Sequence, residues 1–357
     1  MAPLRMLLTL AAAATSAAKC NPSPPAKQCK TKSQRQAWHT YTDEQKRAYI
    51  DAELCLMNKP ATLGLSAAKN RFEELQAVHV LQSGITHGVG AFLPFHRLHM
   101  HAHELLLKTE CGYGGTQPYW DVTHDVGNLA GSAILNPDTG FGGDGVGEDR
   151  CIQDGPFASF INSLGPGYSI TDHCITRRLN ETYHAMGGQE YINACYRRSD
   201  FDTAEPCLEG APHIAGHSAI GGIMNDPIAS PGDPIFYLHH TWLDKVFWDW
   251  QAQDLPSRLT EIGLSNTFKV FDPTTGPPPL PEPQPGDPPI ISVLPDAFPA
   301  PEDLVPPPDA PPQIPRGDGD GDITTLNHVL QMLGVIPDAT IAEGMDIAGG
   351  LLCYEYV

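Results

Sequence analysis

The chain has 357 residues, a hydrophobic content of 41% and a formal net charge of −20 at pH 7. Its length is sufficient to bury a substantial core, and its hydrophobic content is that of an ordinary globular protein. The acidic charge argues against binding of nucleic acid, because phosphate binding needs clustered lysine and arginine. Beyond the N-terminus, no segment is apolar over the length that a membrane-spanning helix needs, so we expect no membrane partner.

The N-terminus is typical of a secretory signal peptide. Arg5 precedes an apolar stretch, and small residues at positions 16 to 18 follow it. We therefore expect a signal peptide over residues 1–18 and a secreted protein. The nine cysteines are widely spaced rather than arranged in CxxC pairs, which in an oxidising environment predicts disulfides and one unpaired thiol. Asn180 begins an N-E-T sequon, which predicts a glycosylation site.

Three histidines lie close together in the first half of the chain: His79, His87 and His96. The spacing of apolar residues over 71–82 predicts an amphipathic helix, with His79 near its apolar face. Three glycines between positions 84 and 90 break this pattern, so we expect His87 on a loop. His96 follows Pro94 and is expected to open the next helix.

A second group of histidines follows about 120 residues later. His213 and His217 are four residues apart, so in a helix both rings project from one face. The run 233–251 has apolar residues at a helical period, which places His239 or His240 in its first turn. Either of these two residues supplies a third imidazole.

Two triplets of histidine indicate two metal ions. Neutral imidazole is a common ligand for copper, zinc, iron and nickel, and three nitrogens suit an ion that keeps positions open for a substrate. Zinc also accepts three histidines, but a zinc enzyme usually needs one triplet and a carboxylate base. Two all-nitrogen triplets favour a redox pair that shares dioxygen. The absence of thiolates from both motifs gives no support to an iron–sulfur or blue-copper site.

These motifs resemble those of the type-3 dicopper superfamily of tyrosinases, catechol oxidases and haemocyanins, in particular short secreted fungal polyphenol oxidases. The resemblance rests on H-x8-H ending in FLPFHR at 87–97, H-x3-H at 213–217, and DPIFYLHHTWLDK at 233–245. It implies a mainly α fold, in which a four-helix bundle surrounds a dinuclear copper site, with long irregular loops and little sheet. The implied ligands are His79, His87 and His96 for copper A, and His213, His217 and His240 for copper B.

The other histidines near the motifs are expected to serve different roles. His99, His101 and His103 alternate along the helix after His96, so they cannot all share its face. We expect them to pack or to orient the ligands. His239 adjoins a ligand and is expected to point elsewhere.

The resemblance also divides the chain into segments. Residues 19–271 are expected to form the dicopper catalytic domain, and 316–357 a C-terminal segment that closes it. Between them, 272–315 is rich in proline, which neither pairs regularly in a sheet nor continues a helix, so we expect an extended surface crossing. The apolar spacing over 324–337 predicts a helix. Arg35 resembles an arginine that relatives place against a terminal tyrosine motif, here Tyr354 and Tyr356.

The resemblance implies that dioxygen oxidises small phenols to ortho-quinones at the copper pair. In relatives, an asparagine after the first copper B ligand and an upstream glutamate are thought to hold a water that deprotonates monophenols. Ile214 takes the place of that asparagine, while Glu205 or Glu209 offers the acid. The missing amide favours o-diphenol oxidation, with monophenol hydroxylation weak or absent.

Alternative functions remain at this level. They are a full tyrosinase with monophenol monooxygenase activity, an o-aminophenol oxidase, and haemocyanin-like oxygen binding, although a single small secreted domain favours an enzyme. Asp244 lies four residues after His240 and is expected either to orient that ligand or to pair with Arg97 or Lys245. The sequence predicts no oligomeric state.

Overall fold

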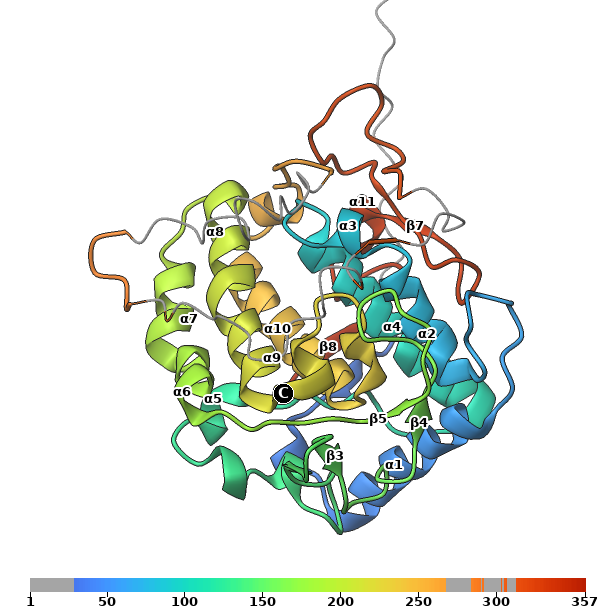
Figure 1. The fold of residues 1–357 in the computed structure, drawn as a ribbon. Helices are drawn as coiled ribbons and strands as arrows, with labels where there is room; N and C mark the ends of the chain where they lie inside the picture. The colour runs from blue at the N-terminus through green and yellow to red at the C-terminus, as the bar shows by residue number, and fades with distance from the viewer. Residues whose placement is uncertain (1–28, 268–283, 290, 292–302, 304, 307–312) are drawn as a thin grey trace, which may run out of the picture.

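A computed structural model of the chain describes residues 29–267, 284–289, 291, 303, 305–306 and 313–357. The predicted signal peptide and most of the predicted proline-rich crossing lie outside these ranges. Within them the fold is mainly α, as predicted, and the strands are few and short (Figure 1). No helix of the described ranges combines the length and apolar character needed to cross a bilayer.

The helices are α1 (Asp43–Asn58), α2 (Arg71–Val80), α3 (Ser83–Thr86), α4 (Phe92–Cys111), α5 (Val122–Asp125), α6 (Glu181–His184), α7 (Gln189–Tyr196), α8 (Phe201–Leu208), α9 (Ile214–Ile220), α10 (Ile235–Gln251) and α11 (Ile341–Gly344). The strands are β1 (Ser33–Arg35), β2 (Gly145–Val146), β3 (Cys151–Ile152), β4 (Ile161–Asn162), β5 (His173–Cys174), β6 (Val329–Leu330), β7 (Ala339–Thr340) and β8 (Tyr354–Tyr356). A π-helical turn, Glu209–His213, joins α8 to α9.

Four of these helices form the centre of the molecule. Helix α4 contacts α2 and α10, and α10 also contacts α9 (Figure 1). Helix α2 begins where the side chain of Asn70 accepts a hydrogen bond from the backbone N–H of Glu73, and every residue of this helix is buried. Because α2, α4 and α10 are largely buried, each depends mainly on packing for its stability.

Two of the predicted helix boundaries are wrong by about one turn. Helix α4 begins at Phe92 rather than at His96. Pro94 lies in its first turn, where the missing N–H has no helical acceptor to lose. Helix α10 begins at Ile235, so His239 and His240 lie in its second turn rather than its first.

The predicted helix over 324–337 is wrong. This part of the chain contains β6, which pairs antiparallel with β7, and several turns. Leu330 and Met332 are buried while Val329, Gln331 and Leu333 are half-buried, so the burial alternates as in a strand. The apolar spacing that suggested a helix is therefore overridden by pairing with β7.

The two ends of the described chain are joined. Strands β1 and β8 pair in parallel, and a disulfide links Cys29 to Cys353. The guanidinium carbon of Arg35 lies 3.5 Å from the centre of the Tyr354 ring, which agrees with the arrangement expected for that arginine. The predicted disulfides are present; the others are Cys55–Cys111, Cys151–Cys174 and Cys195–Cys207. The ninth cysteine, Cys20, lies outside the described residues.

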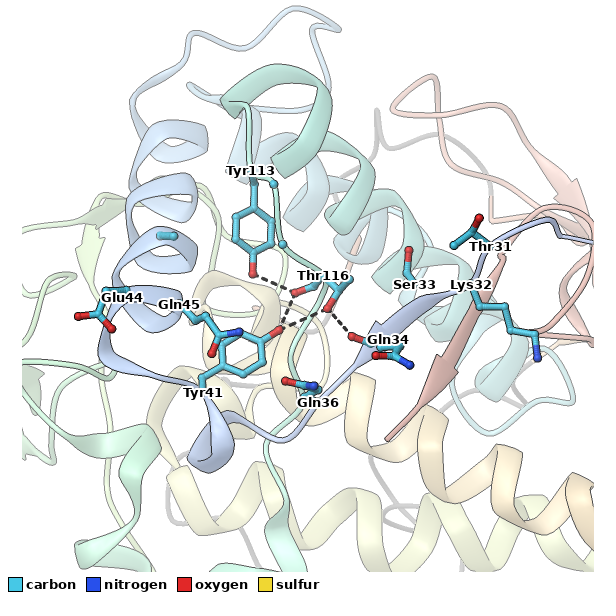
Figure 2. Close-up of a pocket in the computed structure, with 13 residues that line it drawn as sticks. Thr31, Lys32, Ser33, Gln34, Gln36, Tyr41, Glu44, Gln45, Tyr113 and Thr116 are labelled. Carbon is cyan, nitrogen blue, oxygen red and sulfur yellow. Dashed lines mark hydrogen bonds between the residues drawn. The ribbon is translucent and has the colours of Figure 1, made fainter.

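A surface pocket of about 790 Å³ lies beside β1 (Figure 2). The hydroxyls of Tyr41 and Tyr113 both donate to the backbone carbonyl of Thr116, at 3.0 Å each, at the floor of this pocket. Its lining residues come from 31–48 and 113–116, and none of them is a histidine. This pocket is therefore separate from the metal-binding motifs.

Acid should weaken the fold through Glu104, which is buried and pairs with Arg35 at 2.8 Å. Burial alone would raise the pKa of Glu104, but the charges of Arg35 and Lys108 lower it to about 2. The pKa of Glu104 in the folded protein thus lies below the unfolded value of about 4.3. The contribution of ionised Glu104 to the free energy of unfolding is therefore complete above pH 4.3 and is lost as the pH falls toward 2.

Glu104→Gln should therefore lower the free energy of unfolding by about 3 kcal/mol at pH 7, because it leaves a buried guanidinium short of a partner. Glu44→Gln, which breaks the exposed pair with Arg47, is the matched control and should have no measurable effect. Urea unfolding at pH 7 and pH 3 measures both. Equal stability of wild type and Glu104→Gln at pH 7 would contradict the assigned role of this pair.

Candidate metal centre

The structure brings together His79, His87 and His96. His79 is the penultimate residue of α2, His87 directly follows α3, and His96 is in the second turn of α4. One ring nitrogen of each lies within 4.8 Å of the others. The three residues thus converge from three different elements, as their spacing predicted.

The second group contains four histidines: His213, His217, His239 and His240. His213 ends the π-helical turn, His217 lies in α9, and the other two lie in α10. Their ligand atoms also lie within 4.8 Å of one another. A π-helical turn is a frequent feature of functional sites, because it turns side chains away from their regular helical positions.

The two groups adjoin each other. The rings of His96 and His240 stack with their centres 4.2 Å apart, and the rings of His87 and His213 are 6.5 Å apart. His79, His96, His213, His217 and His240 are at most 9% exposed, whereas His87 is half-buried. The histidine cluster is thus enclosed except on the side of His87.

Hydrogen bonds leave one nitrogen of most of these rings free. In five of the six predicted ligands, Nδ1 lies 2.5–3.2 Å from a backbone carbonyl oxygen, to which only a protonated nitrogen can donate. The acceptors for His79, His87, His96, His213 and His217 are the carbonyls of Ile228, Ser83, Phe92, Glu209 and Met224. In all five rings, Nε2 is then the unprotonated nitrogen that can bind a metal.

This pattern fits a metal site. The Nε2 atoms of His79, His96 and His213 are buried and have no hydrogen-bond partner among the described residues. Such atoms are costly to bury unless something coordinates them. Burial lowers the pKa of His87 and of His217 to about 4, so both rings are neutral at pH 7, the form that binds metal.

His239 is held differently from His240. Its Nε2 lies 2.9 Å from the carbonyl oxygen of His213, and its ring lies against Gly216. A Cβ atom at Gly216 would come within 2.2 Å of that ring, which explains the glycine at this position. His240 instead stacks on His96 and has its Nε2 3.0 Å from Nε2 of His217. The geometry therefore favours His240 as the third residue of the second group.

The three histidines that follow His96 have other contacts. Nε2 of His99 lies 3.0 Å from the carbonyl oxygen of Leu75. His103 is buried between Glu53 and Gln117, at 2.9 Å from each. His101 is half-buried on another face of α4. None of the three belongs to either metal-binding group within the described part of the chain.

Glu209 connects the two groups. Its carboxylate accepts a hydrogen bond from the backbone N–H of Gly88, with N–O distances of 2.9 and 3.2 Å, and Gly88 directly follows His87. Burial raises the pKa of Glu209 to about 7. Glu205 lies one turn earlier on α8 and is fully buried, and both its burial and the charge of Glu209 raise its pKa.

Ile214 lies next to His213 and is half-buried. Its side chain packs against an apolar cluster formed by Met186, Tyr191, Ala211 and Ala215. No polar atom is thus available from the side chain at this position.

Asp244 is part of an ion-pair network. Its carboxylate accepts hydrogen bonds from Arg97 and from the hydroxyls of Tyr354 and Tyr356, and Arg35 lies 3.6 Å away. Among the described contacts of Asp244 there is none with a histidine. The predicted pairing with Arg97 is thus present, whereas Lys245 pairs with Asp249 instead. Asp244 lies one turn after His240 on α10, and its carboxylate is occupied by Arg97 and the two tyrosine hydroxyls.

Sequence reasoning missed the backbone carbonyls that hold the rings. Three of them belong to residues four positions before the histidine concerned, a spacing that a helical setting makes available. The other two, those of Met224 and Ile228, lie on the connection between α9 and α10. No local signal in the sequence marks either of them.

The sequence model of the common central domain of tyrosinase matches residues 69–253, which include both histidine groups. The chain belongs to the tyrosinase family. It is accordingly a copper-dependent oxidoreductase with a dinuclear copper centre, to which the two histidine groups correspond.

Individual relatives agree with this assignment. A tyrosinase-like protein of Diaporthe leptostromiformis is 31% identical over 356 residues, covering 93% of this chain and 79% of that protein. Another from the same fungus is 34% identical over 247 residues, covering 66% of this chain and 62% of its own length. The fold is similar to that of a polyphenol oxidase from Thermothelomyces thermophila, with a TM-score of 0.72, 23% identity and coverage of 91% and 88%.

Copper content should distinguish ligands from their neighbours on α4. His96→Ala should lower the copper content from two ions per chain to about one, because two remaining nitrogens hold an ion poorly. His101→Ala removes a half-buried histidine from the same helix and should retain both ions. Atomic absorption on the purified, copper-loaded proteins measures this difference. An equal copper deficit in the two variants would show that the wrong face of α4 had been assigned.

A second pair of variants tests the choice between neighbouring histidines on α10. His240→Asn should lose the second copper, whereas His239→Asn should keep it, because Nε2 of His239 is engaged by the backbone carbonyl of His213 while Nε2 of His240 lies 3.0 Å from Nε2 of His217. Circular dichroism confirms folding, and copper analysis gives the result. Loss of one copper from His239→Asn alone would reverse the assignment.

Proposed function

We propose that the protein is a secreted oxidase that uses dioxygen to convert o-diphenols into o-quinones. The proposed copper ligands are His79, His87, His96, His213, His217 and His240. The observation that carries this proposal is the pair of adjoining histidine groups, in which the buried Nε2 atoms of His79, His96 and His213 have no hydrogen-bond partner among the described residues. Membership of the tyrosinase family gives the class of reaction.

In the proposed reaction, the residues of the chain position the histidine rings, shield the copper pair from water and leave one side open for the phenol. When bound, the copper pair supplies the reduction of dioxygen that accompanies oxidation of the phenol. The backbone carbonyls fix each ring, so little reorganisation is needed during turnover. The half-buried ring of His87 and the exposed Gly88 mark the side from which a phenol enters.

The proposed preference for diphenols rests on Ile214. A phenol with a pKa near ~10 is almost fully protonated at neutral pH, so a monophenol needs help to lose its proton. A water held between a carboxylate and an amide would give that help, but Ile214 offers no polar atom. The carboxylate of Glu209 is also engaged by the N–H of Gly88, and Glu205 is buried.

The alternatives are a full tyrosinase and an o-aminophenol oxidase, which share the same metal centre. A panel of catechols, monophenols and o-aminophenols, followed by oxygen uptake, separates them from the proposed activity. Reversible oxygen binding without turnover of any of these compounds would instead indicate a haemocyanin-like carrier.

Secretion and glycosylation are part of the proposal. Four disulfides are consistent with an oxidising compartment, and Asn180 carries the sequon. N-terminal sequencing and deglycosylation of the protein recovered from culture medium test both. A mature protein that begins at Met1 would contradict cleavage of the signal peptide.

Ile214→Asn should raise the ratio of monophenol to diphenol turnover. The amide would provide a polar partner for the water that deprotonates the monophenol. Ile214→Leu is the matched control, since it keeps an apolar side chain of similar volume and should leave the ratio unchanged. Initial rates with tyramine and with dopamine measure the ratio. Wild-type hydroxylation of tyramine at rates near its dopamine rate would show that deprotonation is handled by another group.

A further inference from the structure

The carbonyl that holds the ring of His79 is itself fixed by two buried side chains. Nδ1 of His79 lies 2.8 Å from the carbonyl oxygen of Ile228. Ile228 lies in a turn between the 3-10 helices Gly222–Asn225 and Ser230–Gly232. A turn has two soft dihedral angles per residue, so it does not by itself keep a carbonyl in one direction. The direction of the Ile228 carbonyl therefore depends on what binds the peptides around it.

The carboxylate of Asp226 binds these peptides from one side. Its Oδ1 accepts hydrogen bonds from the backbone N–H of Ile228 at 2.8 Å and from that of Ala229 at 3.0 Å. In a planar trans peptide, the carbonyl of one residue and the N–H of the next point in opposite directions. Because the N–H of Ala229 is bound by Asp226, the carbonyl of Ile228 is turned away from Asp226, and there it meets the ring of His79.

The side chain of Gln76 binds the next carbonyl along the turn. Its Nε2 donates to the carbonyl oxygens of Ala229 and Leu164, at 3.0 Å each. Gln76 lies three residues before His79 on α2, so the two side chains leave the same face of that helix. Helix α2 thus binds two successive carbonyls of the turn, one through the imidazole and the next through the amide.

Both side chains are also tied to the segment 164–167. Oδ2 of Asp226 accepts a hydrogen bond from the N–H of Gly167 at 2.6 Å, while Gln76 donates to Leu164. Asp226 is 2% exposed and Gln76 is fully buried. A buried carboxylate or amide that loses a hydrogen-bond partner costs free energy, so these contacts define one orientation for each side chain.

We propose that Asp226 and Gln76 are positioning residues for the first copper. By holding the peptides around the Ile228 carbonyl, they keep an acceptor in place for the Nδ1 proton of His79, so that Nε2 of this ring stays free for the metal. The inference rests on the proposed function only in taking His79 as a copper ligand, and it does not depend on the identity of the phenol.

The second histidine group should depend less on these contacts. The carbonyl of Met224, which holds His217, belongs to the 3-10 helix Gly222–Asn225. Asp226 closes that helix through its backbone N–H, which donates to the carbonyl of Ile223 and which a change of side chain leaves in place. We therefore expect loss of the Asp226 carboxylate to weaken the first copper selectively.

The test measures the affinity of each site for Cu(I), by titration of the full-length protein against the chelator bicinchoninate. His240→Asn leaves the first site to be measured alone, and His96→Ala leaves the second. In the His240→Asn background, Asp226→Ala should lower the affinity by about tenfold, the low end for a residue that orients a metal ligand. In the His96→Ala background it should leave the affinity unchanged. In otherwise wild-type protein, Asp226→Ala should release one of the two coppers at a chelator concentration that leaves wild type fully loaded.

Two milder variants separate the individual contacts. The amide oxygen of Asp226→Asn can still accept from the N–H groups of Ile228 and Ala229, so this variant should retain more of the first-site affinity than Asp226→Ala. Gln76→Met keeps the length of the side chain but removes both donated bonds. It should lower the first-site affinity by a smaller factor than Asp226→Ala, because the carboxylate still holds the turn.

Asp318→Ala is the matched control for stability. Like Asp226, Asp318 has a buried carboxylate, 2% exposed, that accepts a hydrogen bond from a loop N–H, here that of Thr325 at 2.8 Å. It also pairs with His328, which belongs to neither histidine group. Asp318→Ala should lower the free energy of unfolding and leave both copper affinities unchanged. Urea unfolding and circular dichroism accompany each variant.

Three results would overturn the inference: an unchanged first-site affinity in folded Asp226→Ala, an equal loss at both sites, or an equal loss in Asp318→Ala. The last two would mean that general destabilisation causes the effect. An Asp226→Asn variant no better than Asp226→Ala would also count against it. The proposed function is judged separately, by oxygen uptake of the wild type with a catechol. Wild type that holds two coppers but oxidises no catechol overturns the proposed function and leaves this inference standing.

Discussion

The protonated nitrogen of a buried neutral imidazole is stabilised by an acceptor, and the arrangement of most of the metal centre follows from this requirement. Five of the predicted ligands meet it with a backbone carbonyl. Two of those carbonyls, of Met224 and Ile228, lie four residues apart on the connection between α9 and α10. The first holds His217 and the second holds His79, so one short connection fixes a residue of each metal group.

Two further sets of contacts join the two histidine groups. The backbone carbonyl of Glu209 accepts from His213, while its side chain accepts from the N–H of Gly88, next to His87. The pair between Arg97 and Asp244 links α4 to α10, the helices that carry His96 and His240. Asp244 thus helps to hold α10 against α4. Three separate contacts thus hold the two histidine groups next to each other, where they would hold the copper pair.

The sequence predicted the metal-binding residues well, because they lie in short motifs. It predicted less well the features that depend on packing between distant parts of the chain. The spacing His213-x3-His217 and the helical periods around His79 and His240 located the residues that the structure brings together. The choice of His240 over His239 depended on resemblance, because the contacts that separate the two rings are all with residues distant in the sequence. Residues 324–337 were misjudged because pairing with β7 outweighs their helical spacing. The carbonyls of Met224 and Ile228 could not be predicted, since nothing in their local sequence differs from an ordinary connection.

The histidine rings and the neighbouring Ile214 are held by different kinds of interaction, and this difference bears on the proposed specificity. Around the metals, hydrogen bonds with defined donors and acceptors fix each ring, so a substitution there leaves a buried polar atom unpaired and costs stability as well as binding. Beside His213, Ile214 contributes apolar contacts that are non-directional and only half-buried. Such contacts can change without disturbing the histidines. Under the proposed function, substitutions at an apolar position such as Ile214 can therefore change the choice of phenol while the hydrogen bonds around the histidines keep the metal centre intact.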